Sequence, residues 1–196
     1  ELKAECDAAG IEFMCTVFLP EDIQTIAPLV EKFKVASFEA GDMRFLKAHA
    51  PFKKPLLVST GMSTTPEVER IITEMCGYPS AFPRGISFLH CVSSYPAPWE
   101  ELNLHVLRTL TYAGFSDHSA HVLTGALAVA AGASIIEVHF RLDSTFPSNP
   151  DYGHSLDPMQ LTEYIANVRF AEAVIGNEVK RMMPSEERWA KYRVRA

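Results

Sequence analysis

The chain has 196 residues, of which 47% are hydrophobic and 21% are charged, as is typical of one soluble globular domain. It carries 18 lysine and arginine residues against 24 aspartate and glutamate residues, so its formal net charge is −6. The composition excludes disordered, collagen-like and coiled-coil chains. The acidic balance, without a basic block, argues against nucleic acid or an anionic membrane as partner.

Cysteine usage and the charged start of the chain predict a reduced, cytoplasmic protein. The four cysteines show neither metal-ligand spacing nor the density of a disulfide framework. Cys15 and Cys91 lie in apolar runs, where cysteine behaves as a small hydrophobic residue. No apolar run is long enough to span a bilayer, and the opening Glu1–Glu5 does not resemble a signal peptide. The chain does not start with methionine, so we leave open that a segment precedes it.

Six short segments of strand-like composition alternate with helical patterns. The predicted strands are Ile11–Phe18, Phe33–Ser37, Pro55–Ser59, Ile86–Val92, Ala113–Ser116 and Ser134–Phe140. The predicted helices are Glu21–Lys32, Thr65–Cys76, Asn103–Tyr112, His121–Ala131 and Asp157–Ile175. The run Thr65-Pro66-Glu67 indicates a helix start, and Gly77 and Gly176 indicate helix ends. The helix His121–Ala131 is nearly all apolar and small, so we expect it to be buried.

This alternation predicts an α/β fold with parallel strands and helices outside. No glycine-rich phosphate loop follows the first strand, which argues against a dinucleotide-binding sheet. A (β/α)8 TIM barrel fits better, although it typically needs about 250 residues and this chain supplies about six β/α units. We expect residues 1–178 to form an incomplete barrel domain. Residues 179–196, which are rich in charge, should be a tail or the start of a linker.

Nearly every predicted strand ends in polar or reactive side chains, which lie on the active-site face of a parallel barrel. They are Thr16, Lys34, Ser37, Ser59, Thr60, Ser93, Tyr95, Ser116, Asp117, His118, Glu137 and His139. Because side chains alternate along a strand, Glu137 and His139 share one face and the apolar residues beside them share the other. The apolar face should meet the helices, so Glu137 and His139 should point into the barrel.

Two histidines at neighbouring strand ends, His118 and His139, suggest a divalent metal site. The alternative, that each is an ordinary packed or surface histidine, stays open. His90 falls on the opposite face of its strand from Ser93 and Tyr95, which favours a structural role. The histidines expected to be solvated or packed on helices are His49, His105 and His121.

Lys34 is the only lysine inside a strand-like run. It could be an edge-strand lysine that discourages aggregation. Inside a closed barrel, however, an inward lysine must meet an anion or a carboxylate. Together with the hydroxyls of Thr16, Ser37, Ser59 and Ser116 it would form a pocket suited to phosphate or carboxylate.

Several runs resemble the N-acetylneuraminate (sialic acid) synthase family, which includes spore-coat polysaccharide and related nonulosonate synthases. They are Cys15–Phe18, Lys34–Glu39, Ser59–Met62, Leu89–Pro96, Phe115–Ser119, Ile136–Phe140, Asn149–Asp151 and Ser155-Leu156. They occur in the family's order along nearly the whole chain. The runs Ser59–Met62, Ser116–His118 and Glu137–His139 make the resemblance specific.

The resemblance implies a (β/α)8 barrel, of which this chain would carry the third to the eighth unit. The family condenses phosphoenolpyruvate with an N-acylated hexosamine, such as N-acetylmannosamine, into a nine-carbon 2-keto sugar acid and releases phosphate. This is a transferase reaction that forms a carbon–carbon bond. A divalent metal, Mn²⁺ or Mg²⁺, would be held by His118 and His139 and would organise the reacting water and the sugar aldehyde.

By the same resemblance, Lys34 and Glu137 would be catalytic. The role of Glu137 stays open between orienting a ligand and transferring a proton. The residues that would bind phosphoenolpyruvate are Lys34, Thr16, Ser37, Ser59 and Ser116, and those that would contact the sugar are Glu39, Tyr95 and Asp151. Ser93 stands where sialic acid synthases proper tend to have asparagine. The acceptor therefore stays open between N-acetylmannosamine, a diacetamido-dideoxyhexose and another aldose.

The family pattern also includes parts that this chain lacks. Two preceding β/α units would supply a glutamate, a second phosphate-binding lysine and a sugar-binding asparagine, and many members add a C-terminal antifreeze-like domain that reaches the partner's site in a dimer. We expect a homodimer for the intact protein. Two alternatives remain: a condensation of the 3-deoxy-octulosonate type, and a non-catalytic remnant or partial barrel that binds sugar or a partner chain.

Overall fold

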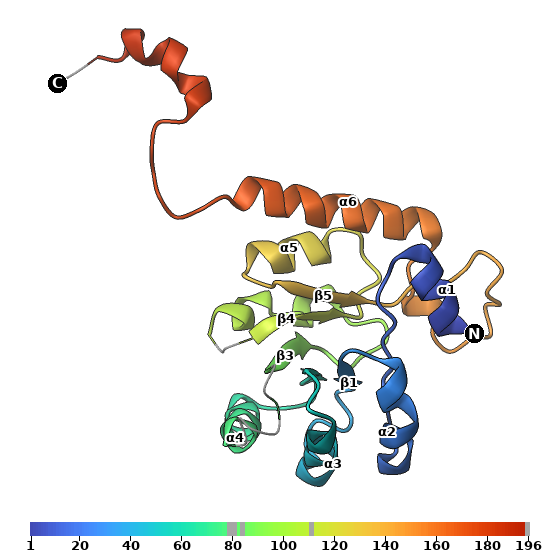
Figure 1. Cartoon of the computed structure of the whole chain (residues 1–196). Coiled ribbons are helices and arrows are strands. Elements are labelled where there is room, and N and C mark those ends of the chain that lie inside the picture. Colours follow the sequence, from blue (N-terminus) through green and yellow to red (C-terminus); the bar gives the residue numbers. More distant parts are fainter. Residues whose placement is uncertain (78–81, 83–84, 110–111, 195–196) are drawn as a thin grey trace.

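The fold is built on one parallel sheet of five strands in the order β1-β2-β3-β4-β5 (Figure 1). The structure is a computed structural model, and it describes residues 1–77, 82, 85–109 and 112–194. The strands are β1 (Phe33–Val35), β2 (Leu56–Ser59), β3 (Ile86–Cys91), β4 (Tyr112–Asp117) and β5 (Ile135–Val138). Each lies next to the following strand of the sequence, as in a β/α barrel, and thus the predicted α/β class with parallel strands is confirmed.

Six α-helices are described, and those that follow strands lie outside the sheet. They are α1 (Leu2–Ala9), α2 (Pro20–Ile26), α3 (Met43–Ala48), α4 (Thr65–Cys76), α5 (Thr124–Ala130) and α6 (Pro158–Ile175). Helices α2, α3 and α4 lie beside β1 to β3, whereas α5 and α6 lie beside β5 (Figure 1). Short 3-10 turns cover Ala27–Leu29, Ala50–Phe52, Trp99–Glu101, Leu104–Arg108, Tyr152–His154 and Pro184–Tyr192.

The sheet is curved like part of a barrel wall. Strands β1 and β5 are four strand spacings apart, which would be about 19 Å in a flat sheet. Yet the Nζ atom of Lys34 on β1 lies 3.4 Å from Oε2 of Glu137 on β5. Two side chains of this length cannot close such a span, so the sheet bends and its two ends approach each other. The structure thus forms a half-barrel.

Two clusters of buried apolar side chains hold the helices against the strands. The larger one contains Phe33 and Val35 of β1, Leu56 and Val58 of β2, and Leu46 of α3. The smaller one lies around Phe115 and includes Ala97, Leu102, Leu107, Ala128 and Ala133. Burying a side chain such as that of Phe33 contributes about 1.5–3 kcal/mol. These contacts fix the strands whose ends carry the polar residues.

Sequence signals set several helix boundaries. Helix α4 covers the predicted range, but its N-cap is Thr64, which forms a capping box with Glu67. The predicted helix Glu21–Lys32 is wrong in its second half, because α2 ends at Ile26 and a 3-10 turn follows. Pro28 explains the break, since proline offers no N–H for the next α-helical hydrogen bond.

Three further expectations differ from the structure. The predicted strand Ile11–Phe18 is wrong: it pairs with β1 only at Thr16, and a strand needs a continuous ladder of backbone hydrogen bonds. The predicted helix Asn103–Tyr112 is a 3-10 turn over Leu104–Arg108, Tyr112 begins β4, and residues 110–111 lie outside the described residues. Helix α5 begins later than predicted and is only partly buried, since Leu127 is exposed.

The segment after α6 leaves the sheet, as Figure 1 shows at the red end of the chain. Its 3-10 turn Pro184–Tyr192 is exposed throughout. The boundary of the barrel domain at residue 178 stays a prediction. Within the part of the chain that the structure covers, no helix combines the length and the apolar character needed to cross a membrane.

Candidate active site

A cavity of about 470 Å³ lies at the ends of the strands. The predicted site residues that line it are Thr16, Lys34, Ser37, Ser59, Tyr95, His118, Glu137, His139 and Asp151. Further lining residues are Phe18, Ala36, Phe38, Pro150 and His154. Polar residues at the predicted strand ends, spread over most of the chain, therefore line one cavity, as expected. Glu137 and His139 lie on its inner face, as strand alternation predicted.

An ion pair between a buried lysine and a partly exposed glutamate joins the two ends of the half-barrel. Lys34 is 6% exposed, and its Nζ lies 3.4 Å from Glu137 Oε2 and donates to the carbonyl oxygen of Val35 at 3.1 Å. Ser59 also donates to Glu137 Oε2, at 3.4 Å. The expectation that an inward lysine meets a carboxylate is confirmed, although β1 is an end strand of the described sheet.

Paired serine hydroxyls flank this ion pair. The Oγ atoms of Ser37 and Ser93 lie 2.7 Å apart, and those of Ser59 and Ser116 lie 2.8 Å apart. Ser93 and Ser116 stand behind the lining and hold the hydroxyls of the lining serines in place. Each hydroxyl can donate one hydrogen bond, so the wall can present donors to an anion beside Lys34.

A close backbone approach supports this wall. The N–H of Gly61 donates to Cys91 Sγ at 3.1 Å, and a Cβ atom on Gly61 would lie 2.0 Å from Ser93 Oγ. Only glycine therefore fits at this position without a shift of its neighbours. Burial raises the pKa of the Cys91 thiol, which keeps it protonated near neutral pH.

Glu39 lies outside the cavity lining. It is half-buried in the turn after β1, and its Oε2 is buried without a hydrogen-bond partner among the described residues. An unpaired carboxylate oxygen is costly to bury, which makes it a candidate for a polar ligand.

His118 has a fixed tautomer. Its Nδ1 lies 2.7 Å from the carbonyl oxygen of Val92, which only accepts, so Nδ1 carries the hydrogen and Nε2 keeps its lone pair. The rings of His118 and His139 are 5.3 Å apart, and the Tyr95 ring lies 4.4 Å from that of His118. Burial lowers the pKa of His118 and of His139, so both imidazoles are neutral near neutral pH.

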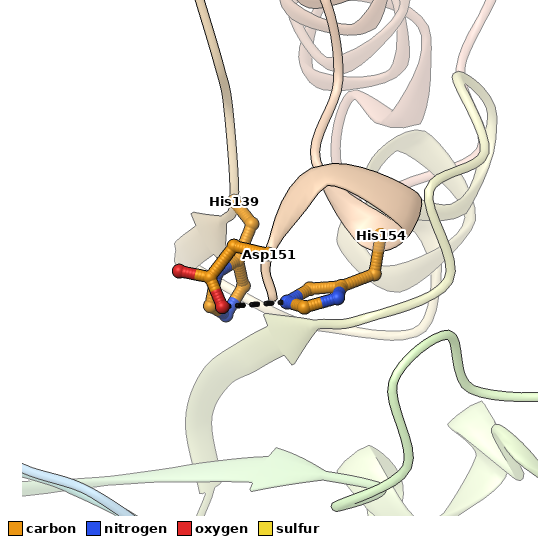
Figure 2. Close-up of side chains that lie close together, drawn as sticks. All are labelled: His139, Asp151 and His154. Carbon is orange, nitrogen blue, oxygen red and sulfur yellow. Dashed lines mark ion pairs between the residues drawn. The ribbon is translucent and has the colours of Figure 1, made fainter. Parts of the chain in front are cut away.

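Sequence reasoning missed a third imidazole at this site. His154 is 4% exposed, and its ring lies 4.7 Å from that of His139. His139, Asp151 and His154 each offer one ligand atom, and these atoms all lie within 4.8 Å of one another (Figure 2). The available signal was the spacing of Asp151 and His154, which puts both on one side of the turn Tyr152–His154.

This donor set fits a divalent cation. Two neutral imidazoles and a carboxylate converge, and His154 Nε2, 3.4 Å from Asp151 Oδ1, makes no hydrogen bond to any residue that the structure covers. Burial, followed by the neighbouring His139, lowers the pKa of His154, which favours the neutral form that metals bind. Imidazole nitrogens together with a carboxylate are suited to Mn²⁺ and other transition metals more than to Mg²⁺.

A buried network holds the strand end that carries His118. Asp117 is buried and accepts hydrogen bonds from the Ser119 N–H at 2.9 Å, from the Tyr164 hydroxyl at 2.8 Å and from the Thr124 hydroxyl. Burial and the Asp117 charge raise the pKa of Tyr164, so its hydroxyl stays a donor. Asp117 therefore points away from the cavity and anchors α5 and α6 to β4.

His90 belongs to the structural scaffold, as its position on the strand predicted. Its Nε2 donates to the carbonyl oxygen of Leu102 at 2.8 Å, and it does not line the cavity. Burial lowers its pKa.

A curved parallel sheet that gathers a lysine, hydroxyls and imidazoles at its strand ends is the arrangement of a β/α-barrel enzyme. The structure overlays on the N-acetylneuraminic acid (sialic acid) synthetase of Leptospira borgpetersenii with a TM-score of 0.87 and 27% identity, over 97% of this chain and 67% of that one. The NeuB family model matches residues 1–180, and the chain belongs to this family.

Two relatives show the breadth of the family. The N,N'-diacetyllegionaminic acid synthase of Legionella pneumophila is 35% identical over 94% of this chain and 54% of its own length. The N-acetylneuraminate-9-phosphate synthase of Homo sapiens is 29% identical over 95% of this chain and 52% of its own length. The chain spans about half the length of the curated relatives it matches.

Proposed function

We propose that the chain is the main part of the catalytic barrel of a nonulosonate synthase that condenses phosphoenolpyruvate with an N-acylated hexosamine. The main support is the cavity at the strand ends, where a buried lysine with paired hydroxyls lies beside a group of neutral imidazoles. These two halves have the chemistry that an acidic, phosphorylated substrate and an aldehyde require. The five strands, together with the preceding segment that pairs with β1 at Thr16, would correspond to the third to the eighth unit of an eight-stranded barrel.

The lysine half of the cavity would take phosphoenolpyruvate. Lys34 supplies a fixed positive charge, and Ser37 and Ser59 supply hydroxyl donors held by Ser93 and Ser116. Thr16 lines the same cavity and would add a further donor. Glu137 balances the Lys34 charge in the absence of substrate, so binding of an anion would exchange one partner of Lys34 for another.

The imidazole half would hold a divalent metal and the aldehyde of the sugar. His118 and His139 would hold the metal, as the family resemblance implies. A bound divalent cation supplies Lewis-acid polarisation of a carbonyl oxygen. Tyr95, Asp151 and Glu39 would contact the acceptor sugar, the last through its unpaired buried oxygen.

The proposed reaction consumes phosphoenolpyruvate, an aldose and water. The C3 carbon of phosphoenolpyruvate forms a bond to the aldehyde carbon, whose oxygen takes up a proton. Water adds at C2, the bond between C2 and the phosphate oxygen breaks, and phosphate leaves with a 2-keto acid as product. Glu137, at the boundary between both halves, is placed to orient the reactants or to accept the proton of the water.

The intact protein would be a homodimer, as the family resemblance implies. A non-catalytic remnant is not favoured, because the lysine, the hydroxyl pairs and the imidazoles are together in one cavity. A condensation that uses a five-carbon aldose would need the same phosphoenolpyruvate-binding half of the cavity, and the choice of aldose distinguishes the two reactions.

The test is phosphate release by the protein at its natural length, with Mn²⁺, phosphoenolpyruvate and a panel of five- and six-carbon aldoses. We expect release that depends on an N-acylated hexosamine. Lys34→Ala should raise the KM for phosphoenolpyruvate and lower kcat, whereas Lys180→Ala on the exposed tail should change neither. An unchanged KM and kcat in active Lys34→Ala protein would contradict the proposal that the lysine half of the cavity binds phosphoenolpyruvate.

A further inference from the structure

We infer that His154 is a direct ligand of the divalent metal, in addition to the imidazoles at the strand ends. The assignment deepens the proposed function and rests on it for the identity of the site. It concerns the run Asp151-Tyr152-Gly153-His154.

The first support is the burial of an imidazole nitrogen without a hydrogen-bond partner. His154 is 4% exposed, and its Nε2 makes no hydrogen bond within the described part of the chain. A buried polar atom left unpaired costs about 1–3 kcal/mol, so such atoms in native proteins generally have a partner. A metal ion would satisfy a lone pair on this nitrogen, as a hydrogen-bond donor would.

The second support is where His154 points. Figure 2 shows the ring of His154 directed towards Asp151 and His139, and the dashed line marks the 3.4 Å between His154 Nε2 and Oδ1 of Asp151. The three ligand atoms of this group lie within 4.8 Å of one another, as expected for atoms around one ion. Two segments supply them: His139 directly follows β5, and the turn Tyr152–His154 gives His154 next to Asp151.

The residues that follow the turn are hydrogen-bonded to the residues that follow β5, which fixes the distance between the two imidazoles. The Leu156 N–H donates to the carbonyl oxygen of His139 at 2.9 Å, and the Arg141 N–H donates to that of Leu156 at 2.9 Å. Arg141 also donates to the carbonyl oxygen of Ser155 at 3.1 Å. His154 is therefore held beside His139 by backbone pairing, so a ligand position there is pre-formed.

A third imidazole changes which metal the site prefers. Nitrogen ligands favour Mn²⁺, Fe²⁺ or Zn²⁺ over Mg²⁺, which prefers oxygen ligands and retains its waters. His154 would also take a coordination position that a site of two histidines leaves to water or substrate. We expect this chain's site to discriminate strongly against Mg²⁺.

The experiment measures Mn²⁺ binding to the protein at its natural length, without substrates. Free Mn²⁺ is followed by electron paramagnetic resonance, and nitrogen ligands are detected by pulsed measurements of the ¹⁴N modulation. His154→Ala removes the ligand, and His154→Phe removes both nitrogens but keeps a ring against Tyr95 and His139. His105→Ala on the exposed surface is the matched control.

We expect both His154 variants to raise the Kd for Mn²⁺ at least about tenfold, since even the loss of an outer partner of a metal ligand costs 10–100-fold. They should also lower the ¹⁴N modulation and reduce the ratio of the Kd for Mg²⁺ to the Kd for Mn²⁺. The melting temperature measured in the presence of a chelator should stay that of the wild type. A Kd within twofold of the wild type in His154→Phe, or an unchanged ¹⁴N modulation, would overturn direct ligation.

Activity separates this assignment from the proposed function. A wild type that binds Mn²⁺ through His154 but releases no phosphate would refute the synthase and leave the ligand in place. A wild type that releases phosphate, with unaltered Mn²⁺ binding in His154→Phe, would refute the ligand alone.

Discussion

The ion pair between Lys34 and Glu137 joins a buried cation to a partly exposed anion, so we expect an unequal response to the loss of either partner. Lys34 is 6% exposed, whereas the Glu137 side chain is 40% exposed. Glu137→Gln leaves a buried cation without its anion, while Lys34→Met leaves a carboxylate that water reaches. The two substitutions keep side-chain size, so the difference between them reports charge.

The magnitude follows from the distance and the burial. At 3.4 Å the attraction is about 5 kcal/mol at an effective dielectric constant of about 20, and about 1 kcal/mol in bulk water. Removing one partner of a fully buried pair costs about 3–5 kcal/mol, and partial exposure of Glu137 reduces this. We expect Glu137→Gln to lower the free energy of unfolding by about 2–3 kcal/mol, and Lys34→Met by about 1 kcal/mol or less.

Urea unfolding of both variants tests this, with and without inorganic phosphate. Phosphate should stabilise Glu137→Gln more than the wild type, because it can replace the missing anion beside Lys34. Phosphate should not stabilise Lys34→Met. A larger loss for Lys34→Met than for Glu137→Gln, or equal stabilisation of all three proteins by phosphate, would refute this account of the pocket.

Three further changes probe the support of the site. Gly61→Ala places a methyl group 2.0 Å from Ser93 Oγ, so it should cost about 1–3 kcal/mol of unfolding free energy in urea titrations. Tyr164→Phe removes a hydrogen bond to the buried Asp117 carboxylate and should cost about 1.5–3 kcal/mol by the same measurement. Burial lowers the pKa of His49, so below about pH 6.5 the unfolded state takes up a proton that the native state does not. The free energy of unfolding should therefore decrease as the pH is lowered. His49→Leu should flatten this dependence in unfolding measurements between pH 7 and pH 5.

Controls for these changes come from the same chain. A Cβ on Gly41 meets no atom within 4 Å, so Gly41→Ala should be close to neutral, and equal losses at both glycines would contradict the packing argument. His105 is exposed, and His105→Leu is the matched surface control for His49→Leu. A Tyr164→Phe protein as stable as the wild type would show that Asp117 does not depend on this donor.

Much of the scaffold follows from local sequence. The β-rich runs around β1 to β5 are short and bounded by turn residues, and the polar residues that follow them end up at one cavity because parallel strands point the same way. The predicted strand Ile11–Phe18 was wrong, because pairing with a neighbouring strand decides whether a segment forms a strand. Ile11 and Phe18 suit a strand, but both are exposed, and the segment pairs with β1 at Thr16 alone.

In the site, too, local sequence predicted some residues, whereas tertiary contacts place others. Strand alternation placed Glu137 and His139 correctly, since their period is local. His154 lies in a turn without regular periodicity, and only the backbone pairing of Leu156 with His139 brings it to the imidazoles. The orientation of Asp117 away from the cavity likewise depends on Tyr164, which is distant in sequence.

The most direct test of the proposed function is the fate of ¹³C-labelled phosphoenolpyruvate given to the natural-length protein with Mn²⁺ and an N-acylated hexosamine. The account predicts that the label at C3 appears in a 2-keto acid three carbons longer than the sugar, with one phosphate released for each product molecule. Recovery of the label as pyruvate, or as unchanged phosphoenolpyruvate under conditions where the cavity binds Mn²⁺, would contradict it.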